Sequence, residues 1–264
     1  MTDNLLPKMG TAAWDTRADS EVDFWRNWVS SKGGKWPEDF QRRTDPETPL
    51  IEAIADQLEE MNLSQPHTAE VLDIGSGPLS LLGYSSPNQA INLTLVDPLA
   101  EAYNVILDNA GITGVPRPQK GYFETALGQL GENRFDVVWC RNALDHSIDP
   151  LLGLHSLIAM CRPGGRVILS FHPNEADTGN YGGLHQWNLN NQDGKICLSQ
   201  KGLELDLTPL LSQQEVLSVS QYDQAGKDKG DVTIKLKKTC DPNLSQAMML
   251  ASASSSKNQL KSEG

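Results

Sequence analysis

The sequence has no long apolar run, no closely spaced cysteine pair and no signal for export. No stretch approaches the roughly 18 consecutive apolar residues of a membrane-spanning helix, and residues 1–10 lack the basic and apolar regions of a secretion signal. The four cysteines are far apart, without the C-x-x-C spacing of zinc or dithiol sites. We therefore expect a cytoplasmic protein with reduced, mostly buried thiols.

Basic residues are also scarce, with 22 Lys and Arg against 34 Asp and Glu and a formal net charge of −12. A field of this sign repels phosphate backbones, which argues against a nucleic-acid substrate. A local basic patch at Lys32, Lys35, Arg42 and Arg43 would be the exception. The apolar content of the 264 residues excludes wholesale disorder, and nothing in the composition indicates an oligomeric state.

Residues 1–45 have no clear period but are rich in aromatic side chains. Four of the six tryptophans lie between residues 14 and 36. Such a segment has too little regular pattern to fold alone, so we expect a helical cap that packs on the rest of the chain. Asp45 and Pro46 then predict a helix that starts there and runs to about Asn62.

From residue 69 onward, strand-like and helix-like segments alternate. Apolar runs predict strands at residues 71–74, 93–97, 115–122, 135–140 and 166–171. Helices are expected between them, at residues 98–111, 124–130 and 149–162. This alternation predicts an α/β fold, a Rossmann-like, doubly wound and mostly parallel sheet.

The same pattern divides the chain into three parts. The main domain is expected over residues 46–240, with an insertion at about 172–202 where the sequence becomes rich in Gly and Asn. Strand-like runs at 215–222 and 231–238 would complete the sheet as a terminal pair. The remaining residues, 241–264, end in a Ser- and Lys-rich stretch that predicts a flexible tail.

The sharpest motif is a glycine pair, Gly75 and Gly77, at the tip of the first predicted strand. Glycines there let a ligand approach the backbone and leave the N–H groups of a following helix pointing at it. Asp97, twenty residues after Gly77, ends the second strand, where an acid binds ribose hydroxyls. The charge of Asp73 and the presence of Ser80 in place of a third glycine disfavour a pyrophosphate. We therefore expect a nucleoside with a cationic, phosphate-free arm, the alternatives being a plain tight turn and a helix-capping acid.

Four segments resemble the class I S-adenosylmethionine-dependent methyltransferases. They are VLDIGSGP at residues 71–78, LTLVDPLA at 93–100, RFDVVWCRNALDH at 134–146 and CRPGGRVILSFH at 161–172. The resemblance covers roughly residues 49–171 and keeps the order and spacing of the family's motifs. It implies a seven-stranded sheet whose last strand is antiparallel, with S-adenosyl-L-methionine as the cofactor over the glycine loop.

The sequence departs from the family pattern at two positions, and the resemblance also implies which residues contact the cofactor. Leu79 stands where the last glycine of D-x-G-x-G-x-G falls, and Gly121 is followed by Tyr122 instead of an acid that receives the adenine amino group. Adenine contact would then come from Tyr122, Phe123 or Glu124. The cofactor-binding residues expected from the motifs are Asp73, Gly75, Gly77, Asp97, Pro98, Tyr122, Phe123 and Asn142.

Three of the five histidines, His146, His172 and His185, follow strand ends or lie in the insertion, on the side where ligands bind. Methyl transfer from a sulfonium is an in-line displacement, so the protein mainly aligns the acceptor with the methyl group. A base is needed only when the acceptor must lose a proton, and histidine suits this near neutral pH. We take His146 as the candidate general base and His185 as the second catalytic candidate, with Asp145 or Asp149 to orient His146.

These observations predict an enzyme that transfers a methyl group from S-adenosylmethionine to a small molecule, at oxygen if His146 is the base. N-methylation of a cationic amine stays open, because the acidic surface and aromatic cap would attract one. A cofactor-binding regulatory subunit without catalysis is the other alternative. A metal site of His146, His172, His185 and a carboxylate has no H-x-H or H-x-x-x-H spacing behind it, so no metal is expected.

Overall fold

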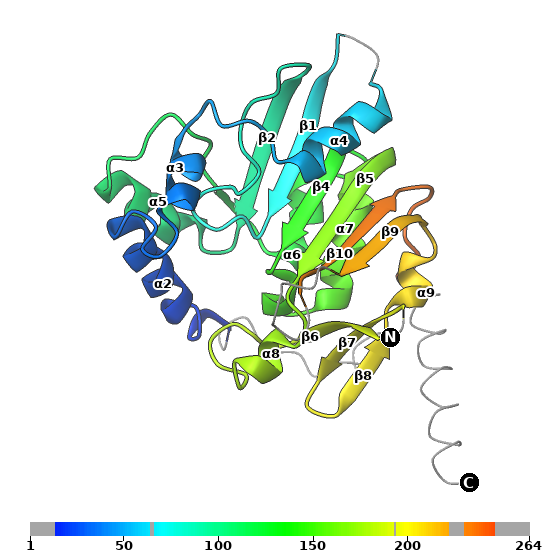
Figure 1. The fold of residues 1–264 in the computed structure, drawn as a ribbon. Coiled ribbons are helices and arrows are strands. Elements are labelled where there is room, and N and C mark those ends of the chain that lie inside the picture. Colours follow the sequence, from blue (N-terminus) through cyan, green and yellow to red (C-terminus); the bar gives the residue numbers. More distant parts are fainter. Residues whose placement is uncertain (1–13, 64–65, 193, 222–229, 246–264) are drawn as a thin grey trace, which may run out of the picture.

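The computed structural model describes residues 14–63, 66–192, 194–221 and 230–245, and its centre is a seven-stranded sheet (Figure 1). The strand order is β3-β2-β1-β4-β5-β10-β9. The strands are β1 Thr68–Ile74, β2 Ala90–Asp97, β3 Gln119–Lys120, β4 Phe135–Arg141, β5 Cys161–Phe171, β9 Glu215–Gln221 and β10 Val232–Lys237. The third strand is therefore much shorter than the expected 115–122.

Strand direction confirms the predicted topology. Neighbouring strands from β3 through β5 pair in parallel, whereas β10 is antiparallel to β5 and β9 is antiparallel to β10. This is the Rossmann-like, doubly wound sheet with the last strand reversed. The carboxyl ends of β1, β2, β4 and β5 lie at one edge, where ligands bind in open α/β sheets.

Helices cover both faces of the sheet, which is why its central strands are apolar runs. They include α4 Glu52–Met61, α5 Ala100–Asn109, α6 Phe123–Leu130 and α7 Pro150–Met160. In Figure 1, α4 crosses in front of the sheet and α6 and α7 lie behind it. Leu72 packs in the core cluster of α7 and Val71 in that of α4, because successive strand side chains point to opposite faces.

The predicted start of the helix before β1 is wrong. Asp45 follows α3 Pro37–Thr44 as its C-cap, and α4 begins only at Glu52. Residues between them pair with the loop after β1: Thr48 accepts hydrogen bonds from the backbone N–H groups of Tyr84 (2.8 Å) and Ser85 (3.1 Å). These tertiary hydrogen bonds hold residues 48–51 extended in spite of the local helix-start signal.

The helix expected after the glycine loop is absent. Residues 75–89, all of them described, form irregular turns that lead directly into β2. Pro78, Gly83 and Pro87 interrupt this segment, and proline and glycine disfavour a helix interior. Backbone N–H groups at the loop are therefore oriented by turns and side chains, not by a helix terminus.

The N-terminal cap is helical, as predicted, and packs beside the glycine loop. It contains α2 Asp19–Ser30 and α3, and α2 contacts α5. Trp28 is buried with Leu79 and Tyr103 in one hydrophobic cluster. Residues 1–13 of the predicted cap lie outside the described part of the chain.

The insertion contains regular structure that the sequence did not reveal. After the short helix α8 Glu175–Thr178, a three-stranded antiparallel sheet forms from β6 Asn188–Gln192, β7 Lys195–Gln200 and β8 Leu203–Asp206, and α9 Thr208–Leu211 follows. Leu198 and Leu205 bury their side chains in the core cluster of the main sheet. These strands are short, and their polar residues hid the alternation.

The C-terminal tail and the state of the four cysteines were also predicted from the sequence. Most of the predicted tail, 246–264, lies outside the described residues, but the backbone N–H of Asn243 donates to Gln213 (2.7 Å). Three cysteines are buried and Cys240 is exposed, all as free thiols, which confirms the prediction. In the described part of the chain, no helix has the length and apolarity to cross a membrane.

Candidate functional site

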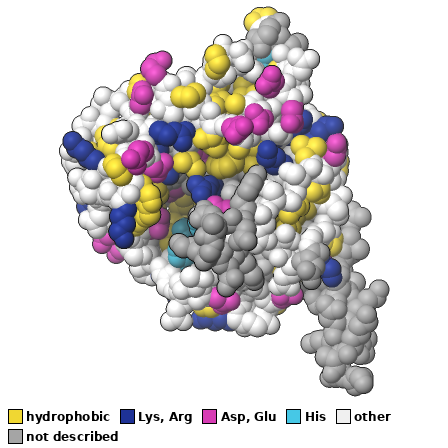
Figure 2. Space-filling model, viewed as in Figure 1, with side chains coloured by type: hydrophobic (Ala, Val, Ile, Leu, Met, Phe, Trp, Pro, Cys, Tyr) yellow, Lys and Arg dark blue, Asp and Glu magenta, His cyan; other side chains and the backbone are white. Residues whose placement is uncertain are grey.

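A cavity of about 340 Å³ opens at the carboxyl edge of the sheet, between the strand ends and α2. All eight of the predicted cofactor residues line it, and so does His146. The cap contributes further lining side chains that were not among the predicted cofactor contacts, among them Glu21, Trp25 and Arg43. Figure 2 shows acidic and basic side chains interspersed over this face of the molecule.

The glycine pair is required by both conformation and space. Gly75 and Gly77 have φ of +72° and +64°, in the left-handed region that favours glycine. A Cβ on Gly75 would lie 2.2 Å from the Cβ of Ala143, and one on Gly77 would lie 3.0 Å from the Trp25 ring. Substitution at Gly75 must therefore displace the loop or the segment after β4.

Asp97 holds the glycine loop in place. Its Oδ2 accepts a hydrogen bond from the N–H of Gly77 (3.0 Å), and its Oδ1 accepts one from the N–H of Leu99 (2.9 Å). Burial raises the pKa of Asp97 to about 7 although these hydrogen bonds oppose the shift. The carboxylate that the sequence assigned to a ribose thus also braces the loop on which the ligand would lie.

Asp73 is held by the residue that departs from the dinucleotide motif. Ser80 Oγ donates to Asp73 Oδ2 (2.6 Å) and accepts from the N–H of Leu82 (3.0 Å). Burial raises the pKa of Asp73 to about 6, against the Ser80 hydrogen bond and the positive charge of Arg43. Ser80 therefore fixes the carboxylate at the cavity.

Arg43 joins the cap to the glycine loop. Its guanidinium lies 5.7 Å from the Trp25 ring centroid and 5.5 Å from that of Trp28, within the range of cation–π contact. It also donates to the backbone oxygen of Leu79 (3.0 Å) and pairs with Asp39. Arg43 is thus engaged inside the protein and does not contribute to a surface patch for nucleic acid.

The expected adenine side is closed by the segment after β3. Tyr122 packs edge-on against Trp14, with ring centroids 5.4 Å apart, and Phe123 lies beside Gly75. Glu124 accepts the backbone N–H of Asp149 (2.7 Å). Asp149 in turn caps α7 by accepting the N–H of Leu152 (3.1 Å).

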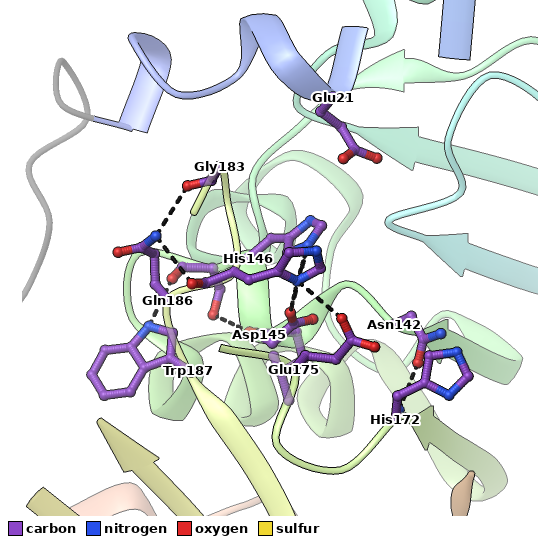
Figure 3. A network of polar contacts seen from close by, with 12 residues as sticks. Glu21, Asn142, Asp145, His146, His172, Glu175, Gly183, Gln186 and Trp187 are labelled. Carbon is purple, nitrogen blue, oxygen red and sulfur yellow. Dashed lines mark hydrogen bonds and ion pairs between the residues drawn. The ribbon is translucent and has the colours of Figure 1, made fainter. Parts of the chain in front are cut away.

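The structure brings His146 and His185 together beside the carboxylate of Asp145. Figure 3 shows Asp145 and His146 at this place. Asp145 Oδ2 lies 2.8 Å from His185 Nδ1 and 3.5 Å from His146 Nε2. The two ring nitrogens, His146 Nε2 and His185 Nδ1, are 3.1 Å apart. Glu175 Oε2 is 3.4 Å from the same nitrogen of His185, so two carboxylates flank the pair.

Electrostatic interactions favour an ionised Asp145 beside a protonated His185. Burial by itself would raise the pKa of Asp145, but the neighbouring His146 and the hydrogen bond from His185 bring it below its usual value. The same hydrogen bond raises the pKa of His185 against the opposing effect of burial. His185 Nδ1 thus lies between Asp145 Oδ2 at 2.8 Å and His146 Nε2 at 3.1 Å.

His172 does not join this cluster, so the set of three histidines considered for a metal is not assembled. His172 Nδ1 forms an ion pair with Asp231, which also pairs with Arg141 at 3.0 Å. Among the described residues, the group that could hold a metal ion is Asp145, His146 and His185, whose ligand atoms lie within 4.8 Å of one another.

Comparison with known proteins matches this geometry to a family. A family model described as a methyltransferase domain matches residues 43–205, more than half of the chain. The chain belongs to the class I S-adenosylmethionine-dependent methyltransferases. S-Adenosyl-L-methionine is the cofactor of this family, and the chain is thus identified as an enzyme of the transferase class.

Curated relatives match over a shorter segment. The ubiquinone biosynthesis O-methyltransferase of Aeromonas salmonicida is 30% identical over 100 residues, which are 38% of this chain and 42% of that protein. The mitochondrial protein of the same description from Schizosaccharomyces pombe is 31% identical over 102 residues, 38% of this chain and 37% of that one. The match therefore spans less than half the length of these relatives.

A solved structure is similar at lower identity. The 1,6-didemethyltoxoflavin-N1-methyltransferase of Burkholderia thailandensis, described with bound 1,6-didemethyltoxoflavin and S-adenosylhomocysteine, is 15% identical, with a TM-score of 0.47. The similarity covers 89% of this chain and 93% of that one.

Proposed function

We propose that the protein methylates a small molecule at oxygen, with His146 and His185 as its catalytic residues. The observation that carries the proposal is the joined set of Asp145, His185 and His146, the last of which lines the cavity. The curated relatives are named O-methyltransferases, which supports oxygen as the acceptor atom.

The cavity residues fit the cofactor. Two buried carboxylates, Asp73 and Asp97, face a space that also has apolar walls, which suits a ligand with an ammonium group, ribose hydroxyls and a flat base. We assign the ribose to Asp97 and the adenine to Tyr122, Phe123 and Pro98. The rest of the cofactor would contact Gly75, Gly77, Asp73 and Asn142. When bound, S-adenosylmethionine supplies a methyl group on a positively charged sulfur.

The histidine pair would remove the acceptor proton. His146 would take the proton of the acceptor hydroxyl while that oxygen receives the methyl group that the bound cofactor would supply, and the electrons of the broken carbon–sulfur bond would remain on sulfur as a neutral thioether. The positive charge gained by the imidazole pair lies beside the carboxylates of Asp145 and Glu175. These charges stabilise the protonated pair.

The test uses labelled methyl donor and a panel of phenols, hydroxy acids and sugars. We expect His146→Ala to lower kcat by about 10² to 10⁴ and to leave S-adenosylhomocysteine affinity within about threefold by calorimetry. His67→Gln is the control, because His67 precedes β1 at the opposite edge of the sheet. Full activity of both His146→Ala and His185→Ala would contradict the proposal. Activity lost on chelation and restored by magnesium or manganese would assign the cluster to an ion instead.

A second candidate, N-methylation of a cationic amine, is favoured by the cap. Glu21, Trp14 and Trp25 line the cavity, and a carboxylate among aromatic rings attracts a cation. Figure 3 places Glu21 across the two imidazole rings from Glu175. Amines in the same panel decide between the candidates, and cofactor binding without turnover on any acceptor would indicate a regulatory subunit.

A further inference from the structure

A second polar cluster lies at the cavity, apart from the histidine pair. Arg141 ends β4, His172 follows β5 and Asp231 precedes β10. These three strands are neighbours in the sheet, and the reversed direction of β10 brings its beginning to the edge where β4 and β5 end. Three segments distant in sequence thus place one charged or titratable side chain each at the same point.

One carboxylate organises the cluster. Asp231 Oδ2 is 3.0 Å from Arg141 Nη2, and Asp231 Oδ1 pairs with His172 Nδ1. The backbone N–H of His172 is also held, by Asn142 Oδ1 at 2.8 Å. Both Arg141 and His172 are fixed in place from one side while they line the cavity.

Within the described part of the chain, the guanidinium of Arg141 has donors left for a ligand. It carries five N–H groups in a planar fork that matches a carboxylate, and its contact with Asp231 is made through one terminal nitrogen. The side chain is 35% exposed. Arg43, the other arginine at the cavity, is by contrast enclosed between two tryptophans. Arg141 is therefore the cavity arginine that is positioned but still open to an anion.

The position of the cluster favours the acceptor over the cofactor. Arg141 ends β4, but its hydrogen bond to Asp231 directs the guanidinium toward the beginning of β10. One neighbour of β10 is β5, which lies three strand spacings from Asp97 at the end of β2, about 14 Å at 4.8 Å per strand. With the ribose at Asp97 and the cationic arm near Asp73 on β1, the cofactor extends toward β4. The β5 and β10 side is then left for the acceptor, next to His146.

We propose that the acceptor carries a carboxylate that Arg141 binds, with His172 and Asp231 as positioning residues, so that the substrate class is a hydroxylated organic acid. This inference rests on the proposed function. Arg141 would hold the acid group while the hydroxyl lies near His146, and the fork geometry would select acids over neutral compounds of the same shape.

The test measures binding to the full chain saturated with S-adenosylhomocysteine. Calorimetry compares three acids with neutral counterparts: 3,4-dihydroxybenzoate with catechol, salicylate with phenol, and 2-hydroxybutyrate with 2-butanol. We expect at least one acid to bind about 10- to 100-fold more tightly than its counterpart. Arg141→Gln should abolish that difference, and Arg141→Lys, which keeps the charge without the fork, should retain part of it.

Controls separate this inference from the proposed function. Arg117→Gln is the arginine control: Arg117 pairs with Asp108, donates to the backbone oxygens of Asn104 and Ile112 and does not line the cavity, so the acid preference should be unchanged. Melting temperatures show whether each variant folds. No acid preference in the wild type, or a preference that survives Arg141→Gln, would overturn the inference. A loss of affinity in Arg141→Gln for S-adenosylhomocysteine but not for 5′-methylthioadenosine would assign Arg141 to the cofactor's carboxylate and also overturn it. A wild-type protein that does not bind S-adenosylhomocysteine would contradict the proposed function instead.

Discussion

The two sides of the cavity are built differently. On the side of β1 and β2, residues 73–80 and Asp97 form the site through backbone conformation and short-range hydrogen bonds. On the side of β4 and β5, the site joins Asp145 and His146 to His185 and Glu175 from the insertion, and Arg141 to Asp231. The first side is a local motif that recurs with a cofactor, and the second is a tertiary assembly that can differ with the acceptor.

The largest expected effect comes from a substitution on the β1 and β2 side of the cavity. Gly75→Ala should abolish measurable S-adenosylhomocysteine binding and destabilise the protein by about 2 to 4 kcal/mol, because its Cβ would collide with Ala143. Gly111→Ala is the matched control: Gly111 also has a positive φ, of +67°, but has open space around its Cβ position. Equal losses in the two variants, by denaturant titration, would show that backbone strain alone is responsible.

Asp97→Asn tests the carboxylate on the same side. We expect cofactor affinity to fall by about 1 to 3 kcal/mol, because ribose hydroxyls would lose a charged acceptor. Wild-type affinity should rise as pH increases through about 7, since burial raises the pKa of Asp97 to about 7 and only the ionised form is the strong acceptor. In Asp97→Asn this dependence should vanish, whereas the exposed Asp108→Asn should keep it. A flat wild-type profile in calorimetry would contradict the assignment.

Ser80→Ala has a smaller expected effect, the loss of the two hydrogen bonds made by the Ser80 hydroxyl. The free energy of unfolding should fall by about 1 to 2 kcal/mol, because Asp73 would lose its hydroxyl donor. The loss should be greater above pH 6 than below it, since the hydrogen bond stabilises the ionised carboxylate, whose pKa is raised to about 6 by burial. Ser30→Ala, on an exposed helix end, is the control. A pH-independent loss would show that Asp73 does not ionise in this range.

Asp145→Asn tests the β4 and β5 side of the cavity, because it removes the charge of the side chain and nearly keeps its shape. The carboxylate raises the pKa of His185, so the variant should shift the His185 titration to lower pH in an NMR pH series. Asp149→Asn is the control, because Asp149 caps α7 and is not among the groups that shift the pKa of His185. An unchanged titration in Asp145→Asn would show that Glu175 is the partner that matters.

From the sequence, the β1 and β2 side of the cavity could be predicted well, and the β4 and β5 side only in part. Gly75, Gly77 and Asp97 are recognisable because their roles depend on φ angles and on an offset along the chain. His146 and His185 could be proposed individually, but their contact through Asp145 could not, since they are 39 positions apart and α7, β5 and α8 lie between them in the sequence. Ser80 could be noticed because it stands in place of the third glycine of the dinucleotide motif. Nothing in the sequence pointed to Arg141 or Asp231.

The sequence by itself determined the α/β class, the seven-stranded sheet with a reversed last strand, the cofactor and the glycine loop, because hydrophobic periodicity and turn residues act over a few positions. Tertiary structure decided what replaced the helix after β1, where α4 begins, how β6, β7 and β8 pack, and which charged side chains meet. Those outcomes depend on pairing between distant backbone segments and on burial, which only the folded chain brings about.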